Sequence, residues 1–327
     1  MMQKNNYDET VQGTHLNAGG NVTLTALTAR ATAQTPAPSS GNGVTDTRRA
    51  VSENRPQAVG DITLQSAHIS SKGGAIAVQA SGDVNLLGSD EQHHSYQQTR
   101  VVNSGLLSST TTTTRDETNR RLAIGSSLDG NSISIQSGKN INVTGSDVSA
   151  KQDITLVAMN DINIKAATET YQATHKREEV TNGLVGSGMG MTIGQDKQST
   201  ETNIDGATQS QSRSHIGSSN GNVRLMSGGN TLIVGSDLAA AQGKLAVAAG
   251  GGIGIFAGQD TLKQYTETQH TQDTDIFSKQ KRVVTDTLIT SRYQGSTLAG
   301  TSIDINAGAN LVLQAAQLNS KGDTNLA

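Results

Sequence analysis

The chain has 327 residues, with 36 glycines, no cysteine, no tryptophan and only 2% aromatic residues. A compact core of that size normally uses many aromatic side chains, because each buries a large area. Since only 33% of the residues are hydrophobic, the composition favours either disorder or a fold with a thin, repeated core. The formal net charge of -3 gives no electrostatic reason to expect a nucleic-acid partner.

The first residues do not have the pattern of an export signal. Residues 1–14 lack a charged segment followed by an apolar stretch, so they do not predict a signal peptide. No apolar run in the chain approaches the length that a membrane-spanning helix needs. We expect 1–14 to be disordered or a remnant of an upstream part, and the chain to be a fragment of a longer protein.

Pairs of hydrophobic residues separated by one polar residue recur along the chain. Ile133 and Ile135 are followed, 21 positions further on, by Ile154 and Leu156. This alternation predicts strands with one buried face, and the Gly, Ser, Asn and Asp between the pairs predict turns. A unit of 21–22 residues with three short strands is typical of one rung of a β-solenoid. A leucine-rich repeat has a similar length, but its Leu and Asn spacing and its helical side are absent.

A longer period of about 90 positions relates the rungs to one another, since it carries Ile133 to Val223 and Ile135 to Leu225. The sequence therefore predicts an all-β fold, a right-handed parallel β-helix of roughly seven rungs about 4.8 Å apart. The inward Ile, Leu and Val side chains should form ladders along its axis. The segments assigned to rungs are 15–30, 60–88, 130–166, 221–258 and 300–327.

Polar segments rich in Thr, Gln and Ser separate the rungs, at 31–59, 89–129, 167–220 and 259–299. Each of the last three begins near a tyrosine and returns through an arginine and a glycine. The residues are Tyr96, Tyr171 and Tyr265 on the way out and Arg121, Arg213 and Arg292 on the way back. Threonine-rich stretches favour extended backbone, and Asn-Gly is a strong hairpin signal. We interpret the segments as β-hairpin arms that project from the rod or lie along it; disordered loops are the alternative.

The six tyrosines and arginines are candidate surface-contact residues. They could bind a glycan by stacking, or a protein partner through aromatic and arginine contacts. The structural alternative, which we favour, is that each returning arginine stacks on the outgoing tyrosine as a cross-strand pair.

Segments such as GSDVSAKQDITLVAMNDINIKAATETYQATHKR and GSDLAAAQGKLAVAAGGGIGIFAGQDTLKQY resemble the haemagglutinin repeats of filamentous-haemagglutinin-like exoproteins. This family includes the large proteins of contact-dependent growth inhibition. The resemblance covers residues 15 to 327. The interrupted repeats look most like the second repeat region of the growth-inhibition exoproteins, which is implicated in moving the C-terminal toxin across the target cell's outer membrane.

The resemblance implies two-partner secretion through an outer-membrane transporter, a location outside the cell or on its surface, and contact with the target-cell surface or outer membrane. The rest of the parent exoprotein would adjoin this segment at both ends. The N-terminal secretion domain and the C-terminal toxin of the family are missing here. The leading interpretation is a non-catalytic stalk or delivery segment that supports contact-dependent toxin delivery. An adhesin segment is the alternative. A polysaccharide-active β-helix enzyme is a remote one, because Phe256 is the only aromatic residue on the rungs.

Other motifs have simple structural explanations, so we predict no catalytic, cofactor-binding or metal site. Histidines in the arms lie beside acidic residues, but nothing in their spacing makes several converge on a metal. The Gly-Ser-Asp segments at 88–90, 145–147 and 235–237 could place aspartates for calcium at equal positions of successive rungs, although Asx-type turns explain them more simply. The glycine-rich segments 186–194 and 250–258 lack the helix that a phosphate loop needs. The first is an arm apex that could contact a membrane or a protein.

Both ends of the chain fall inside the repeat pattern. An uncapped rung exposes unpaired backbone groups and apolar side chains. We therefore expect the isolated segment to associate end to end.

Overall fold

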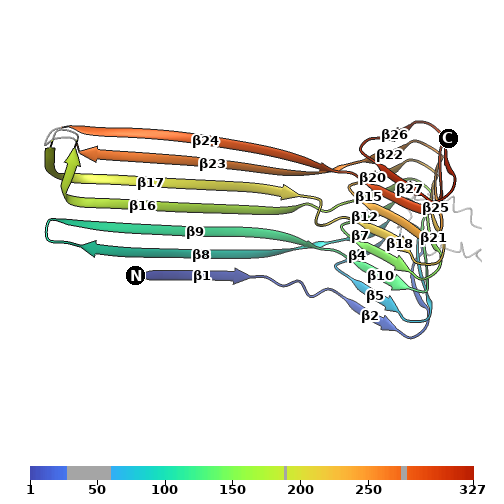
Figure 1. The fold of residues 1–327 in the computed structure, drawn as a ribbon. Coiled ribbons are helices and arrows are strands. Elements are labelled where there is room, and N and C mark those ends of the chain that lie inside the picture. Colours follow the sequence, from blue (N-terminus) through green and yellow to red (C-terminus); the bar gives the residue numbers. More distant parts are fainter. Residues whose placement is uncertain (28–59, 188–189, 274–277) are drawn as a thin grey trace, which may run out of the picture.

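The computed structural model describes residues 1–27, 60–187, 190–273 and 278–327, except the side chains of 185–187 and 190–192. Two bodies are visible: a rod of short stacked strands, and a slab of long strands that extends sideways from it (Figure 1). None of the described residues forms a helix that is long and apolar enough to cross a membrane. The expected arm 31–59 and the end of the first rung segment lie outside the described residues.

The rod has three strand positions per rung, which we call a, b and c in chain order. Position a contains β2 (His15–Ala18), β5 (His68–Ser71), β10 (Ser127–Gly130), β13 (Asp147–Ala150), β18 (His215–Ser218) and β27 (Gln317–Ser320). Position b contains β3 (Val22–Ala26), β6 (Ala75–Ala80), β11 (Ser132–Ser137), β14 (Ile154–Ala158), β19 (Val223–Ser227) and β28 (Thr324–Leu326). The long strands β21 (Asp237–Ala249) and β25 (Thr297–Ala307) run through both positions, so a and b form one parallel sheet.

Position c forms a second parallel sheet of seven strands. They are β4 (Ile62–Gln65), β7 (Val84–Leu87), β12 (Ile141–Thr144), β15 (Ile162–Lys165), β20 (Thr231–Val234), β22 (Ile253–Phe256) and β26 (Leu311–Leu313). The fold is therefore a parallel β-helix, as expected.

The predicted hydrophobic ladders are confirmed. Ile133 lies directly opposite Ile154, which lies opposite Val223, and Ile141 lies opposite Ile162. All five side chains are at most 2% exposed. Because a strand side chain repeats its direction every second residue, the x-Φ-x-Φ pattern places both hydrophobic residues of a pair in the core, as Ile133 and Ile135 show.

The corner between positions c and a alternates between two constructions. On every second rung it is a tight turn through a residue with a left-handed backbone: Ser66, Gly145, Gly235 or Ala315, with φ between 48° and 55°. On the intervening rungs the chain leaves the rod as a long hairpin and returns to the next position-a strand. An arm on every second rung explains the long sequence period of about 90 positions.

Buried serines line this corner. The backbone N–H of Ser126 donates to the Oγ of Ser146 at 3.0 Å, and the N–H of Ser236 donates to the Oγ of Ser296 at 3.1 Å. The hydroxyl of Ser296 in turn donates to the carbonyl of Phe256 at 2.7 Å. These hydrogen bonds satisfy backbone groups that would otherwise be buried without a partner, so the serines stabilise the corners from which the arms depart.

The arms join in one antiparallel sheet in the order β1-β8-β9-β16-β17-β23-β24. Its strands are β1 (Met2–Asp8), β8 (Ser89–Ser104), β9 (Ser108–Ile124), β16 (Glu169–Ser187), β17 (Gly190–Thr208), β23 (Gly258–Asp273) and β24 (Lys279–Gln294). The disorder considered for residues 1–14 is not observed at Met2–Asp8, which pairs with β8.

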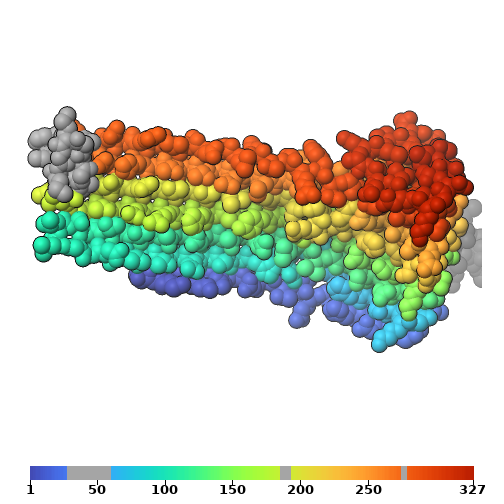
Figure 2. Space-filling view, viewed as in Figure 1, coloured from blue at the N-terminus to red at the C-terminus, as the bar shows by residue number. Residues whose placement is uncertain are grey.

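Rung spacing explains why the arms merge. Successive arms are two rungs apart, or about 9.6 Å along the rod, and a two-stranded hairpin is equally wide, since neighbouring strands lie about 4.8 Å apart. Each arm therefore fills the space up to the next one, and the slab has no gaps between its coloured bands (Figure 2).

Candidate functional site at the base of the arms

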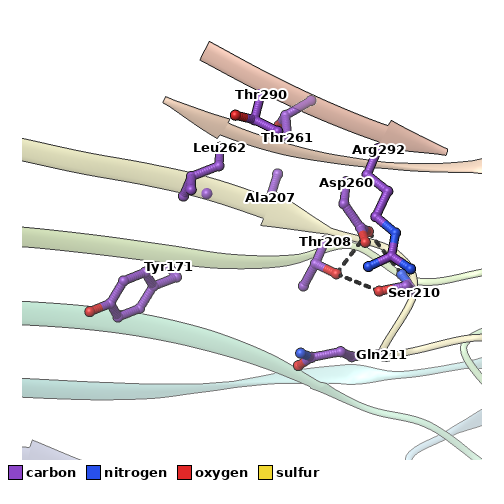
Figure 3. Close-up of a pocket in the computed structure, with 11 residues that line it drawn as sticks. Tyr171, Ala207, Thr208, Ser210, Gln211, Asp260, Thr261, Leu262, Thr290 and Arg292 are labelled. Carbon is purple, nitrogen blue, oxygen red and sulfur yellow. Dashed lines mark hydrogen bonds between the residues drawn. The ribbon is translucent and has the colours of Figure 1, made fainter. Parts of the chain in front are cut away.

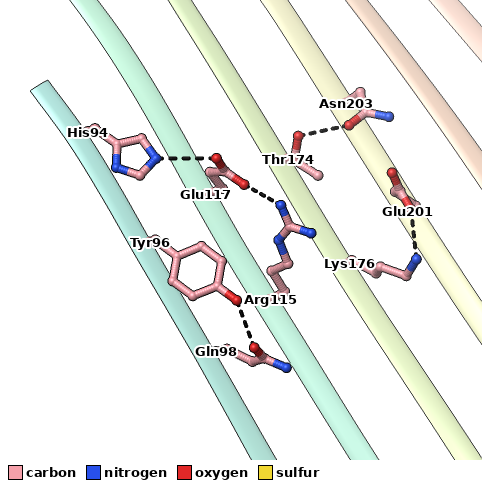
Figure 4. A network of polar contacts seen from close by, with 9 residues as sticks. All are labelled: His94, Tyr96, Gln98, Arg115, Glu117, Thr174, Lys176, Glu201 and Asn203. Atoms are coloured by element: carbon pink, nitrogen blue, oxygen red, sulfur yellow. Dashed lines mark hydrogen bonds and ion pairs between the residues drawn. The ribbon is translucent and has the colours of Figure 1, made fainter. Parts of the chain in front are cut away.

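The arm sheet is held together by polar side chains. On one face, Glu117 of β9 accepts from His94 of β8 at 3.2 Å and forms an ion pair with Arg115 at 2.5 Å (Figure 4). The hydrogen bond from Arg115 is the largest cause that lowers the pKa of Glu117, followed by that from His94. Further along the same face, Lys176 of β16 pairs with Glu201 of β17 at 3.1 Å. His94 with Glu117 and Lys176 with Glu201 thus link neighbouring strands, whereas Arg115 and Glu117 stand on the same strand. Each of these partly exposed contacts contributes little alone.

An open hollow of about 360 Å³ lies where the second and third arms approach the rod. Tyr171 of β16 lies at one end of it, and Arg292 of β24 and Asp260 of β23 lie at the other (Figure 3). Gln211, from the connection between β17 and β18, also lines it. We call this feature the arm-base hollow. It combines an aromatic ring with charged and amide groups, which are the groups that recognise polar ligands such as sugars.

Asp260 is already engaged in structural hydrogen bonds. Its Oδ1 accepts from the Thr208 hydroxyl at 2.8 Å and from the backbone N–H groups of Gln209 at 2.7 Å and Ser210 at 3.0 Å. Desolvation by burial opposes ionisation of this carboxyl, but the hydrogen bonds from Ser210, Gln209 and Thr208 outweigh it and lower its pKa to about 2. An acid with such a low pKa stays ionised near neutral pH, so Asp260 is unsuited to donate a proton there.

Of the six candidate contact residues, the structure brings Tyr171 and Arg292 to the same hollow. Arginines do stack on two of the tyrosines, but they are not the arginines that the sequence singled out. Arg115 lies over the ring of Tyr96 at 5.5 Å, and Arg120 lies over the ring of Tyr171 at 5.3 Å. Both arginines belong to β9, so the second stack joins two neighbouring arms.

The remaining candidates lie apart from the hollow. Arg121 forms an ion pair with Asp90 across the first arm. The side chain of Arg213 is only 16% exposed and binds Asp237 of the next rung, with Nε at 2.8 Å from Oδ2. The hydroxyl of Tyr265 donates to Glu267 at 3.0 Å. Arg213 therefore braces two neighbouring rungs.

The three Gly-Ser-Asp segments do not occupy equal positions of the rungs. The possibility that their aspartates are placed equivalently for calcium is therefore wrong. Asp90 lies at the start of an arm, whereas Asp147 and Asp237 begin position-a strands with His215 between them in register. Burial raises the pKa of Asp147, and the nearby His215 partly opposes this. Among the described residues, no group of three or more His, Asp or Glu side chains could hold a metal ion. Most of the apex segment 186–194 lies outside the described side chains.

Sequence reasoning missed Arg115, Arg120 and Asp260. Arg115 and Arg120 stand in the same return strand as the expected Arg121, and only the register between neighbouring strands decides which arginine meets which ring. Asp260 follows its rung directly, in Gly-Gln-Asp. It was missed because the pattern shared by the arms consists of tyrosines and arginines and includes no aspartate.

Comparisons with known proteins place the chain among repeat proteins. A family model described as "Hemagglutinin repeat" matches residues 107–274, just over half of the chain. The tRNA nuclease CdiA of Escherichia coli (strain STEC_O31) is 36% identical over 168 residues, which are 51% of this chain and 5% of that protein. The 16S rRNA endonuclease CdiA of Enterobacter cloacae is 38% identical over 166 residues, or 50% of this chain and 5% of that protein.

A third relative covers more of the chain. The tRNA nuclease CdiA-2 of Burkholderia pseudomallei is 30% identical over 210 residues, which are 64% of this chain and 7% of that protein. No solved structure matches the chain. The match thus covers only a small part of each relative, and the nuclease names describe those whole proteins.

Proposed function

Because the chain belongs to the haemagglutinin-repeat family of filamentous-haemagglutinin-like exoproteins, which includes the contact-dependent growth inhibition proteins, we propose that it is a non-catalytic delivery segment of a secreted surface exoprotein. Its role would be to hold the arm sheet at a fixed place on the rod while a toxin carried elsewhere in the parent protein enters a neighbouring cell. Export through an outer-membrane transporter and contact with the target-cell surface belong to the same proposal.

One observation carries this proposal: the arms form a single continuous sheet beside the rod. Disordered linkers would not need an insertion on every second rung or a hairpin width that matches two rungs. The charges on this sheet are mostly paired with each other, as Lys176 is with Glu201 and Lys197 is with Glu178 at 2.8 Å. Such pairing is suited to holding strands together rather than to chemistry on a substrate.

The test removes the arms and keeps the rod. Each arm is replaced by one glycine, so that β7, β15 and β22 lead directly into β10, β18 and β25, as β12 leads into β13 through Gly145. In a full-length growth-inhibition exoprotein that carries this segment, we expect surface display and cell attachment to persist and toxin entry to fall at least tenfold. Unchanged toxin entry by an armless protein that is displayed normally would refute the role.

A second candidate function is adhesion, and the arm-base hollow favours it because Tyr171 and Arg292 line the same concave site. On this reading, Tyr171→Ala with Arg292→Ala should lower binding to glycans or target cells by at least tenfold. The matched control is Tyr96→Ala with Arg121→Ala, which removes the same residue types outside the hollow. Retained adhesion by the variant with Tyr171 and Arg292 replaced would refute an adhesive role of the hollow.

Mutating Tyr96, Tyr171 and Tyr265 together should leave the rungs folded, as circular dichroism can check.

A further inference from the structure

Three arm-to-arm seams in the slab share one construction. In each, the strand that returns to the rod pairs antiparallel with the outgoing strand of the following arm: β1 with β8, β9 with β16, and β17 with β23. β1 belongs to this series, since it leads into the position-a strand β2 as the other return strands lead into theirs. At every seam, an outgoing strand therefore pairs with the edge of the preceding return strand.

Each seam also contains an aspartate–histidine pair, with the aspartate on the return strand. Asp8 lies 3.1 Å from His93, and Asp196 lies 2.7 Å from His270. The third pair joins Asp116 and His175, which are directly opposite in register. The first pair is also directly opposite, whereas Asp196 and His270 are diagonal neighbours.

β24 is a return strand whose outer edge has no partner strand among the described residues. Nearly all of its side chains are exposed, including Val283 at 45% and Ile289 at 68%. It contains no proline in its 16 residues. A long exposed edge of this kind presents unpaired N–H and C=O groups and is a template for another strand.

Asp286 on β24 corresponds to the aspartate that each of the three seams has on its return strand. It stands nine positions before Gly295, as Asp116 stands nine positions before Gly125. Both glycines lead into the first serine of a rung corner. In the described part of the chain Asp286 forms no ion pair, whereas Asp116 pairs with the histidine of the next arm.

We propose that the outer edge of β24 is a docking site for the outgoing strand of a further haemagglutinin-repeat arm, added antiparallel with a histidine opposite Asp286. The register of β9 with β16, transferred to β24, tests the fit. It places His175 opposite Asp286, Glu169 opposite Arg292 and Glu179 opposite Arg282. None of the directly opposed positions then carries two like charges, so an outgoing strand of this class is complementary to the edge.

The probe is a fluorescent peptide with the sequence of residues 169–182, titrated into the 327-residue chain at low salt. We expect saturable binding in fluorescence anisotropy and slower hydrogen exchange at 279–294 when the peptide is present. Since cross-strand pairs have modest energies, each charge reversal should weaken binding by about fivefold. The reversals are Asp286→Lys and Arg282→Glu, and Asp129→Lys on an exposed rung position is the matched control.

Restored binding between Arg282→Glu protein and a peptide with Glu179→Arg would support the transferred register. Binding without protection of β24, or binding that both reversals leave unchanged, would overturn the proposal. Dimerisation of the chain alone, with the amides of β24 protected in the dimer, would also overturn it and assign the edge to a second copy.

Discussion

Replacing Ile154 by aspartate is expected to unfold the rungs around β14. The side chain is fully buried between Ile133 and Val223 in the inward ladder. The substitution removes a packed side chain and buries an unpaired charge, which together should cost at least about 4 kcal/mol. Because a solenoid is stabilised by contacts between neighbouring rungs, the loss should spread to β11 and β19. Urea denaturation followed by circular dichroism, with hydrogen exchange in both strands, measures it.

The neighbouring residue provides the control. Thr155 points outward on the same strand, between Ser134 and Arg224 in register. Thr155→Asp should therefore change stability by less than about 1 kcal/mol. If Ile154→Asp prevents folding altogether, Ile154→Val keeps the test quantitative, with an expected loss of about 1 kcal/mol. Equal effects of aspartate at 154 and 155 would contradict the inward ladder.

The rod could be predicted from sequence because one physical constraint repeats in every rung. Inward positions must be apolar and of similar size to stack on the rungs above and below, so the step from Ile133 to Ile154 appears directly in the sequence. The hairpin character of the described arms was also predictable, since each leaves and rejoins the rod through similar residues.

The pairing of arms with each other could not be predicted. Both faces of the slab are polar, so no hydrophobic alternation marks the register between neighbouring arms. The seams depend on pairs such as Asp116 with His175, which belong to segments 59 residues apart. Only the geometry of the rod, which spaces the arms by two rungs, brings these side chains together. The same cause explains why the arm-base hollow and the stack of Arg120 on Tyr171 were missed.

Gly145→Ala is expected to destabilise the rod by about 3 kcal/mol. Gly145 makes the tight corner between β12 and β13 with φ +54°, where an L-residue is strained by about 1–2 kcal/mol. An added Cβ would also lie 2.5 Å from the Cβ of Ala167, and relieving that overlap adds about 1–2 kcal/mol. Thermal denaturation of the purified chain measures the loss.

A second corner gives the comparison that separates strain from a general effect of substitution. Ala315 occupies the equivalent turn between β26 and β27 with φ +54°. Here the L-residue is already strained, so Ala315→Gly relieves about 1–2 kcal/mol in the folded chain and loses about 0.5–1 kcal/mol through the more flexible unfolded chain. The net change should be a small gain. A loss of stability in Gly145→Ala together with a gain in Ala315→Gly would show that the left-handed turn favours glycine. This turn lets a rung close without an arm. A loss at both positions would refute this explanation, because removing the strained alanine would then bring no benefit.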